Sequence, residues 1–383
     1  MKTAIYFDNN GTTALDKRVL EAMLPYLAEQ PGNATSRHVY GRSARTAIDQ
    51  ARQQVAAAVG AHPSQIVFTG SGTEADNLAI TGMAATRDDA EQIVYSAIEH
   101  PAVARPTQAM RLRGKKAAVI GVDGNGQVRM THLQELLQTP TALVSVMLAN
   151  NETGVVQDIA AIAEEAKRHG AYMHTDAVQA LGKLPLDFAA LGVHAMSLSS
   201  HKINGPQGAG ALVLDKRVDL QPLIYGGGQE KGLRSGTENV AAIVGFGAAC
   251  ELASRELTQG SSAVRALRDQ LERGLRALGA VIFGLGATRL SNTSFFAFPG
   301  VEGETLVMAL DRKGFAVASG SACSSDSTEP SHVLLAMGVA PDLARGAVRI
   351  SLAGSNTAVQ VEAFLLTLQE ELTRLKQMAA IAV

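Results

Sequence analysis

The stretch "IVFTGSGTEADNLAI" (residues 66–80) combines a short apolar run, a glycine-rich turn and a helix-like run. A strand that leads through such a turn into a helix is the basic unit of an α/β protein. The free backbone N–H groups and the positive dipole end at the helix start also favour phosphate binding. The turn is neither a Walker loop, because no GK[ST] follows, nor a GxGxxG motif. An ordinary tight turn is the alternative interpretation, since the chain contains 37 glycines.

The same alternation continues along the chain. Helix-like runs such as "PAVARPTQAMRLR" and "IAAIAEEAKRHG" stand between strand-like runs, which are "QIVYSAIEH", "TALVSVMLAN", "AYMHTDA", "AMSLSSHK" and "GAGALVLD". Near-continuous apolar strands separated by helices are typical of a mainly parallel sheet covered on both faces. The sequence therefore predicts an α/β fold for this part of the chain.

The region after about residue 260 has a different pattern. Strand-like "AVIFG", "SNTSFFAFP", "FAVASG" and "AVRISLAG" are mixed with helical runs, the last of which begins near Ala358. This pattern predicts a smaller α+β unit. The polar stretch "LTQGSS" (residues 257–262) is the expected boundary. We therefore expect a large domain over residues 16–257 and a small domain made of residues 1–15 and 258–383.

Composition excludes several classes of protein. The net charge of −2, the absence of Trp and an aromatic content of 4% do not indicate direct nucleic-acid binding. No apolar run approaches the ~20 residues of a membrane span. Two cysteines form no disulfide framework, and the start "MKTAIYFDNNGTT" lacks the pattern of a signal peptide. A cytoplasmic protein without a membrane partner is the expectation.

Two residues at predicted strand ends carry chemistry. Lys202 in "LSSHKINGPQGAG" lies where α/β folds bind ligands, and its amine is a candidate Schiff-base nucleophile. Asp176 in "YMHTDAVQALGK" is a candidate partner for the pyridinium nitrogen of pyridoxal phosphate (PLP). The alternatives are a surface lysine that ends a strand and an aspartate that caps a helix.

His100 and Arg349 add two further functions. His100 in "SAIEHPAV" follows another strand and is suited to stacking on a flat ring and to moving protons. Arg349 in "VRISLAG" is suited to bidentate binding of a carboxylate. A structural histidine and an interdomain salt bridge are the alternative interpretations.

The two cysteines differ in their surroundings. Cys250 in "GFGAACELA" lies among small apolar residues of a helical pattern and is interpreted as packing. Cys323 in "SGSACSSDSTEPSH" (residues 319–332) lies in a string of small polar residues, which favour mobile surface loops. A reachable thiolate there is a candidate nucleophile, with an idle exposed thiol as the alternative.

Together these residues make the set of parts that a PLP enzyme acting on an amino acid needs. CxxC, HExxH and GxSxG motifs are absent, and the nine histidines show no metal-ligand spacing, so no metal site is expected.

The chain resembles the cysteine desulfurases of the NifS-like group, in the class V aminotransferase superfamily of PLP enzymes. The resemblance covers nearly the whole chain and is carried by "YFDNNGTT", "FTGSGTEADNLAI", "ANNETGVVQDI", "HTDAVQALGK", "SLSSHKINGPQGAG", "GGGQEKGLRSGTEN" and "SGSACSSDSTEPSHVL". It implies the aspartate aminotransferase-like fold, fold type I. The chain departs from the group at Gly11, where Ala is common, at Asn204, where an aromatic residue or His is common, and at Gln207, where Lys is common.

The resemblance also implies a role for each matching residue. Lys202 would hold the cofactor covalently and act as a base, Asp176 would pair with the ring nitrogen, and His100 would stack on the ring. Gln179 would meet the ring hydroxyl, while Asn151 and Arg349 would meet the ring and the substrate carboxylate. The phosphate would be bound by Gly72, Thr73, Ser199, His201 and, from a second subunit, Thr237. Cys323 would take the sulfur.

The implied reaction is the PLP-dependent conversion of L-cysteine to L-alanine, with sulfur passed to Cys323 as a persulfide and then to an acceptor protein, either a scaffold or a thiolation enzyme. A homodimer is implied as well. Iron–sulfur cluster biogenesis, tRNA thiolation, cofactor synthesis and sulfur modification of DNA backbones are all open as destinations. Two alternatives are enzymes: a selenocysteine lyase, and an aminotransferase or another class V PLP enzyme. Two others are not enzymes on their own: a sulfur-transfer component that is inactive without a partner, and a nucleotide-binding module.

Overall fold

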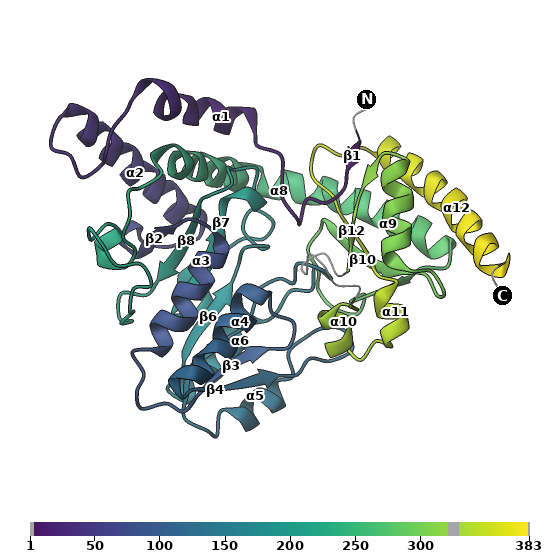
Figure 1. Cartoon of the computed structure of the whole chain (residues 1–383), viewed down its shortest axis with the longest axis horizontal. Coiled ribbons are helices and arrows are strands. Elements are labelled where there is room, and N and C mark those ends of the chain that lie inside the picture. Colours follow the sequence, from purple (N-terminus) through teal and green to yellow (C-terminus); the bar gives the residue numbers. More distant parts are fainter. Residues whose placement is uncertain (1–3, 321–328, 382–383) are drawn as a thin grey trace.

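The computed structural model describes residues 4–320 and 329–381. Its larger sheet has seven strands in the order β2-β8-β7-β6-β5-β3-β4 (Figure 1). Their bounds are β2 Ile66–Thr69, β3 Gln92–Ser96, β4 Lys116–Ile120, β5 Thr141–Ser145, β6 Tyr172–Asp176, β7 Ala195–Ser199 and β8 Gly210–Leu214. The neighbours from β7 to β4 pair in parallel, and β8 runs antiparallel to β2 and β7. The prediction of a mainly parallel sheet is confirmed.

The strand β4 was not among the predicted strands. It lies at the edge of the sheet and pairs with β3. Its burial is partial, whereas β2, β3, β5, β7 and β8 are buried along their whole length. An edge strand needs no continuous apolar run, so "KAAVI" gives a weak signal.

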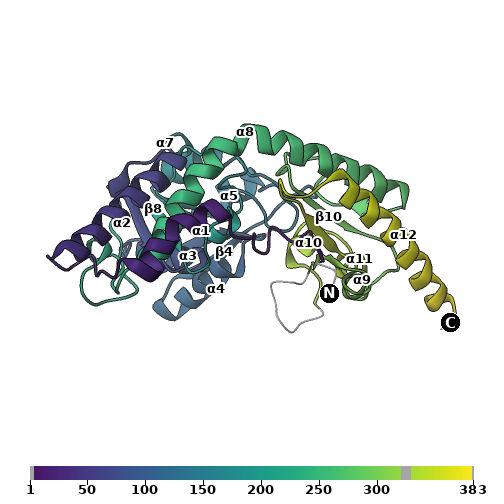
Figure 2. The same cartoon turned by 90° about the horizontal axis from the view of Figure 1, so that it is seen from above.

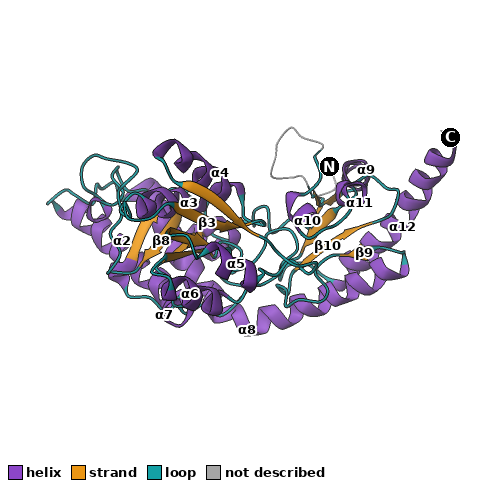
Figure 3. Ribbon diagram, turned by 90° about the horizontal axis from the view of Figure 1, so that it is seen from below, coloured by secondary structure: helices purple, strands orange, loops and turns teal. Residues whose placement is uncertain are grey.

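Helices cover both faces of this sheet (Figure 3). Alternate side chains of β2 point to opposite faces: Ile66 and Phe68 belong to one core cluster and Val67 to another. The first cluster includes residues of α2 (Val39–Ala58), α5 (Met130–Leu136), α6 (Ile159–Arg168) and α8 (Val240–Ala277). The second includes residues of α3 (Gly72–Asn77), its π-helical continuation (Leu78–Met83) and α4 (Pro101–Ala109). Short helices α1 (Lys17–Leu24) and α7 (Phe188–Leu191) complete this part.

A second sheet of four antiparallel strands has the order β12-β13-β10-β9. The bounds are β9 Val281–Ile282, β10 Thr293–Ala297, β12 Ala318–Ser319 and β13 Val348–Ser351. Helices α9 (Gly303–Arg312) and α12 (Ala358–Ile381) enclose its own core, and α10 (His332–Ala336) and α11 (Pro341–Arg345) lie nearby. Near the N-terminus, β1 (Ile5–Tyr6) pairs in parallel with β11 (Phe315–Ala316). The predicted smaller α+β unit is thus present.

A single helix, α8, connects the two parts and runs along both of them (Figure 2). Its first half contributes Phe246 and Cys250 to the large core, and its second half contributes Leu271 and Leu275 to the small one. Residues 257–262, the expected boundary, therefore lie within a helix and not in a loop. One glycine in a long helix costs only about 1 kcal/mol, which packing at both ends offsets. The division at residue 257 stays a prediction.

Within residues 4–320 and 329–381, no helix combines the length and the apolar character that crossing a bilayer requires.

Close packing of α8 against α2 depends on a small residue. A Cβ atom on Gly247 would lie 2.7 Å from Ala51 Cα and 2.9 Å from Ala51 Cβ, and it would also overlap Gln54 Oε1. We expect Gly247→Ala to lower the free energy of unfolding by about 1–3 kcal/mol, because the two helices must separate. A Cβ atom on Gly260, in the same helix, would meet no neighbouring element of the described chain within 4 Å. Gly260→Ala is therefore the control and should raise the free energy of unfolding by up to about 1 kcal/mol.

Denaturant titration of both variants measures these changes. An equal effect of the two substitutions would show that helix propensity, and not the contact with α2, decides the outcome.

Candidate active site

A cavity of about 360 Å³ lies at the carboxyl ends of the large-sheet strands, between the two parts of the chain. Parallel α/β sheets bind ligands at this edge. Ten of the twelve residues predicted for the site line the cavity: Gly72, Thr73, His100, Asn151, Asp176, Gln179, Ser199, His201, Lys202 and Arg349. Segments far apart in the sequence thus bring these groups to one place, although their individual roles stay predictions.

Lys202 ends a single 3₁₀ turn (Ser200–Lys202) directly after β7. Its amine donates hydrogen bonds to the backbone carbonyls of Asn10 and Gly11, each at 2.6 Å. Two carbonyl acceptors hold the amine in a defined position at the cavity wall. The interpretation as a simple surface lysine does not fit this placement.

Asp176 is the last residue of β6, and its Oδ1 accepts from the Val178 backbone N–H at 2.9 Å. Turns, not a helix, follow it within the described chain, so the alternative of a helix cap does not hold in its simple form. Burial raises the pKa of Asp176 to about 6, while the Val178 hydrogen bond and the charge of Lys202 oppose the rise.

Two further carboxyl groups are buried near Asp176. Burial raises the pKa of Glu99 to about 8, and burial together with the charge of Asp176 raises the pKa of Asp76 well above its ordinary value. The ring of His174 lies 3.6 Å from Asp76 Oδ1, and burial lowers its pKa to about 3. His174 is therefore neutral, and the pair is not an ion pair. Glu99 therefore holds its proton near neutral pH, and the pKa of Asp76 is shifted in the same direction, whereas Asp176 ionises more readily than Glu99.

His100 precedes α4 and caps it, because its Nδ1 accepts from the Ala102 backbone N–H at 3.1 Å. Burial, followed by the charge of Lys202, lowers the pKa of His100 to about 4. The ring is neutral near pH 7. With Nδ1 used as an acceptor, Nε2 is the nitrogen that carries the proton.

The turn before α3 approaches the strands closely. A Cβ atom on Gly72 would lie 2.8 Å from Val178 Cγ2 and 3.2 Å from Ser199 Cβ. A residue larger than glycine would therefore fill the corner of the cavity between Gly72, Val178 and Ser199. A Cβ atom on Gly210 would lie 2.5 Å from the carbonyl carbon of Ser71. The buried hydroxyl of Ser199 has no hydrogen-bond partner among the described residues. His201 Nδ1 is 3.1 Å from Thr12 Oγ1, and burial lowers the pKa of His201 to about 4.

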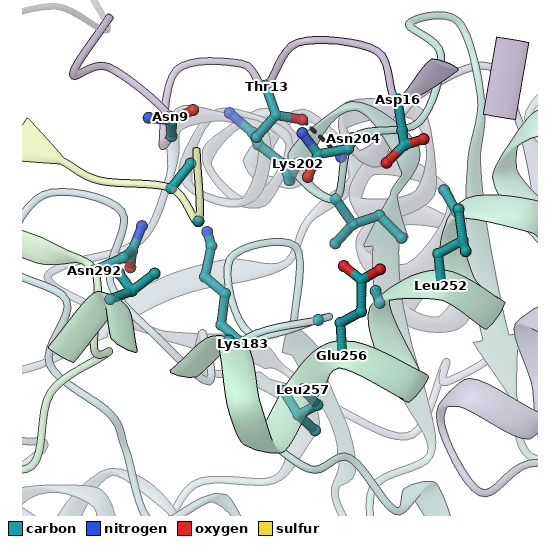
Figure 4. A pocket seen from close by; sticks show the side chains of 18 of the residues that line it. Asn9, Thr13, Asp16, Lys183, Lys202, Asn204, Leu252, Glu256, Leu257 and Asn292 are labelled. Atoms are coloured by element: carbon teal, nitrogen blue, oxygen red, sulfur yellow. Dashed lines mark hydrogen bonds between the residues drawn. The ribbon is translucent and has the colours of Figure 1, made fainter. Parts of the chain in front are cut away.

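Gln179 is fixed by hydrogen bonds at both ends of its amide. Its Nε2 donates to the Asn10 carbonyl at 3.0 Å, and its Oε1 accepts from the Lys183 amine at 2.7 Å. Burial, followed by the charges of Lys202 and Arg349, lowers the pKa of Lys183 to about 7. Lys183 and Lys202 both line a second cavity of about 180 Å³, together with Asn9 and Asn292 (Figure 4).

Arg349 extends from the middle of the small sheet into the same cavity as Lys202 and is only 4% exposed. Its Nη1 donates to the Asn151 carbonyl at 3.1 Å, and its Nη2 donates to Asp8 Oδ1 at 2.6 Å. Asp8 and Arg349 both belong to the predicted small domain, so this ion pair is not the interdomain salt bridge of the alternative interpretation, and Arg349 also faces the cavity.

One further predicted residue that the structure describes does not line this cavity. Thr237 is exposed in the segment before α8. Cys323 falls outside the described residues. Cys250 is fully buried, and burial raises the pKa of its thiol, as a packing role requires.

Sequence reasoning assigned no role to Asp8, Asn10 or Lys183. All three belong to stretches that carried the resemblance, "YFDNNGTT" and "HTDAVQALGK". Polar residues repeated within "DNN", and a lysine four positions after Gln179, were the available signals. The contacts of Asn10 with Asn151, of Lys183 with Asn10 and of Asp8 with Arg349 span 141 to 341 residues of sequence, so pattern alone does not identify these partners.

Residues 5–364 match the family model described as aminotransferase class-V. A cysteine desulfurase of Gluconacetobacter diazotrophicus is 43% identical over 380 residues, which cover 98% of this chain and 95% of the relative. A solved structure described as a NifS-like protein has a TM-score of 0.91 at 39% identity, covering 97% of this chain and 100% of that chain. Another solved structure, described as SspA in complex with cysteine, has a TM-score of 0.82 at 33% identity. The match covers 92% of this chain and 99% of that chain.

The chain belongs to the class V aminotransferase family, within its NifS-like cysteine desulfurase group. The resemblance and the fold type seen in the sequence are thereby confirmed. Members of this family are in general PLP-dependent enzymes.

The buried Glu99 gives a pH-dependent stability that can be measured. Its pKa is about 8 in the folded chain against an ordinary value of 4.5. Between these values the folded state keeps a proton that the unfolded state loses, so rising pH lowers the free energy of unfolding by up to about 1.4 kcal/mol per pH unit. Glu99→Gln carries no such proton. We expect its stability relative to the parent to increase from pH 5 to pH 9.

Chemical denaturation at pH 5, 7 and 9 measures the difference, with Glu29→Gln as the control because Glu29 is exposed to water. A difference between Glu99→Gln and the parent that does not change with pH would mean that Glu99 is ionised in the folded protein.

Proposed function

We propose that this chain is a PLP-dependent cysteine desulfurase in which Lys202, Asp176, His100, Arg349 and Cys323 carry the reaction. L-cysteine and the Cys323 thiol would give L-alanine and a Cys323 persulfide, which then passes its sulfur to an acceptor protein. The observation that carries the proposal is the single cavity that joins a lysine amine, a buried carboxyl, a neutral imidazole and an arginine.

The cavity residues fit PLP. The buried Ser199 hydroxyl, which has no partner among the described residues, and the side-chain-free corner at Gly72 suit a phosphate group. Gly72, Thr73 and His201 complete that end. Asp176 suits the ring nitrogen, Gln179 the ring hydroxyl, and Lys202 the covalent attachment. When bound, PLP supplies an electron-withdrawing ring that stabilises negative charge at the Cα of an amino acid.

Lys202 is the residue that takes the Cα proton in this proposal. Its amine already lies at the cavity wall, held by the carbonyls of Asn10 and Gly11. Asp176, which ionises more readily than Glu99, provides the negative charge opposite the ring nitrogen. Arg349 and Asn151 orient the substrate through its carboxylate.

His100 exchanges a proton with the substrate thiol through Nε2, because its Nδ1 is occupied by the Ala102 N–H. The Cys323 thiolate then attacks the substrate sulfur. A sulfur–sulfur bond forms as the substrate C–S bond breaks, the electron pair that stays on Cβ is protonated, and the proton that Lys202 removed returns to Cα, which gives alanine. No outside oxidant is required, since the sulfur leaves as a persulfide.

The assembly we propose is a homodimer. Thr237 is exposed and lies outside the cavity of its own chain, as expected if it completes the phosphate site of a second subunit. The relative described as bound to cysteine supports L-cysteine as the substrate. A cytoplasmic location belongs to the proposal too, because a nucleophilic thiol stays reduced in that compartment.

The assignment of Cys323 is tested by alanine production from L-cysteine with a thiol reductant present. We expect Cys323→Ala to bind L-cysteine but to release no sulfur, with turnover reduced by at least about 100-fold, because the sulfur has no nucleophile to accept it. Cys250→Ala is the matched control, since that thiol is buried and should be unnecessary. Full turnover by Cys323→Ala would remove this residue from the mechanism.

The assignment of Lys202 is tested by the retention of PLP. We expect Lys202→Ala to lose covalently attached PLP and its visible absorbance after gel filtration under mildly denaturing conditions, because no amine remains at that position. Lys216→Ala removes an exposed lysine after β8 and should keep both. Covalent PLP in Lys202→Ala, located by mass spectrometry after borohydride reduction, would identify a different lysine.

A further inference from the structure

The carboxylate partner of Arg349 in this structure comes from the chain itself. Asp8 Oδ1 accepts from Arg349 Nη2 at 2.6 Å, and Asp8 and Arg349 both line the cavity that contains Lys202. Arg349 Nε is buried and has no hydrogen-bond partner among the described residues. The guanidinium therefore has a carboxylate on one nitrogen and an unused buried donor on another, as in a carboxylate-binding group that is only partly occupied.

Gly11 is what allows the Asp8 carboxylate to lie here. A Cβ atom on Gly11 would lie 2.9 Å from Asp8 Cγ and 3.1 Å from Oδ1, and it would overlap Oδ2. A methyl group at position 11 and the Asp8 carboxylate therefore exclude each other. Gly11 is also one of the positions at which the sequence departs from the group it resembles, where alanine is common.

The backbone cannot easily move to relieve such an overlap. The Asp8 carbonyl accepts from the Gly11 N–H at 2.9 Å, and the backbone N–H groups of Asn9 and Asn10 donate to Ser351 at 3.1 and 2.8 Å. Asp8 also forms a bridge with Ser351 of β13. A side chain at position 11 would therefore displace the Asp8 side chain and leave the main chain in place.

We propose that Asp8 occupies the carboxylate subsite of Arg349 in the substrate-free enzyme, that Gly11 makes this possible, and that an incoming amino acid must compete with Asp8. The inference rests on the proposed function, because it takes Arg349 as the group that binds the substrate carboxylate. Two carboxylates on one guanidinium repel each other, so the internal one weakens binding of the external one. Asp8 is therefore an autoinhibitory residue that raises the substrate concentration at which the enzyme saturates.

An alternative role for the same contact predicts the opposite result. If Asp8 only held Arg349 in position for the substrate, its removal would leave the guanidinium less ordered and would weaken binding. The sign of the change in affinity therefore distinguishes competition from positioning.

The test measures the dissociation constant of L-alanine, the proposed product, for the PLP-loaded protein by isothermal titration calorimetry. We expect Asp8→Asn to bind L-alanine about tenfold more tightly, because a charge-assisted contact no longer competes. Gly11→Ala keeps the aspartate but moves it, so we expect a change in the same direction of about threefold. Gly124→Ala is the control, because a Cβ there would meet only one atom of the described residues within 4 Å, at 3.9 Å.

Cysteamine is the matched ligand, since it has the thiol and amine of cysteine but no carboxylate. Its affinity should not change in Asp8→Asn or Gly11→Ala. Arg349→Ala should weaken L-alanine at least tenfold and leave cysteamine unaffected. The KM for L-cysteine should fall in Asp8→Asn in parallel with the dissociation constant of L-alanine.

The outcomes separate the inference from the function on which it rests. If Arg349→Ala does not weaken L-alanine, Arg349 is not the carboxylate site, and both are overturned. If Arg349→Ala weakens L-alanine but Asp8→Asn weakens it too or leaves it unchanged, Asp8 does not compete, and only the inference fails. Gly11→Ala decides the same point should Asp8→Asn not fold. If Asp8→Asn binds L-alanine and cysteamine more tightly by the same factor, the effect does not depend on the carboxylate, and the inference is overturned as well.

Discussion

The segment from Asp8 to Thr13 is bonded to both parts of the chain, and the site depends on it. On one side, Asn9 and Asn10 hydrogen-bond to Ser351 of the small sheet. On the other, the carbonyl of His201 accepts from Thr13, and the carbonyl of Asn10 accepts from Lys202. Asn204 adds a hydrogen bond from its side chain to the carbonyl of Ala14 while adopting a left-handed backbone with φ of 62°. A short segment that contains a hydrogen-bonded turn, in which the Gly11 N–H donates to the Asp8 carbonyl, thus connects the lysine and the arginine that share the cavity.

Burial, more than direct ion pairing, determines the charge states in this cavity. His100, His174 and His201 are all neutral near pH 7 because their desolvation outweighs nearby charges. Desolvation also raises the pKa of Asp76 and of Glu99. Two features stand out against this background: the Asp8–Arg349 ion pair, and Asp176, whose pKa of about 6 is lower than that of Glu99. In such a site, a few charged groups determine most of the electrostatic potential that a ligand meets.

The sequence was sufficient for the large sheet and for most of the cavity, because buried parallel strands are apolar along their length and bring their carboxyl ends together. It was insufficient where burial is partial, as in β4, and where polar composition concealed a continuous helix, as in α8. It also could not pair Asp8 with Arg349, which are 341 residues apart. Such contacts follow from tertiary packing, which leaves no periodic pattern in either segment. Position 11 drew notice as a departure from a family pattern, yet its effect depends on the space beside Asp8, which only the folded chain defines.

The burial of Cys250 has a practical consequence for following sulfur through this protein. The chain has two cysteines, and Cys250 is enclosed in the large core with a thiol that resists ionisation. Reagents and oxidants that require a thiolate in contact with solvent will not reach it while the fold is intact. The mass of the intact chain then reports how many sulfur atoms are bound at Cys323 alone, and no variant that lacks Cys250 is needed. Isotopically labelled sulfur could be counted in this way at every step of delivery to a candidate acceptor.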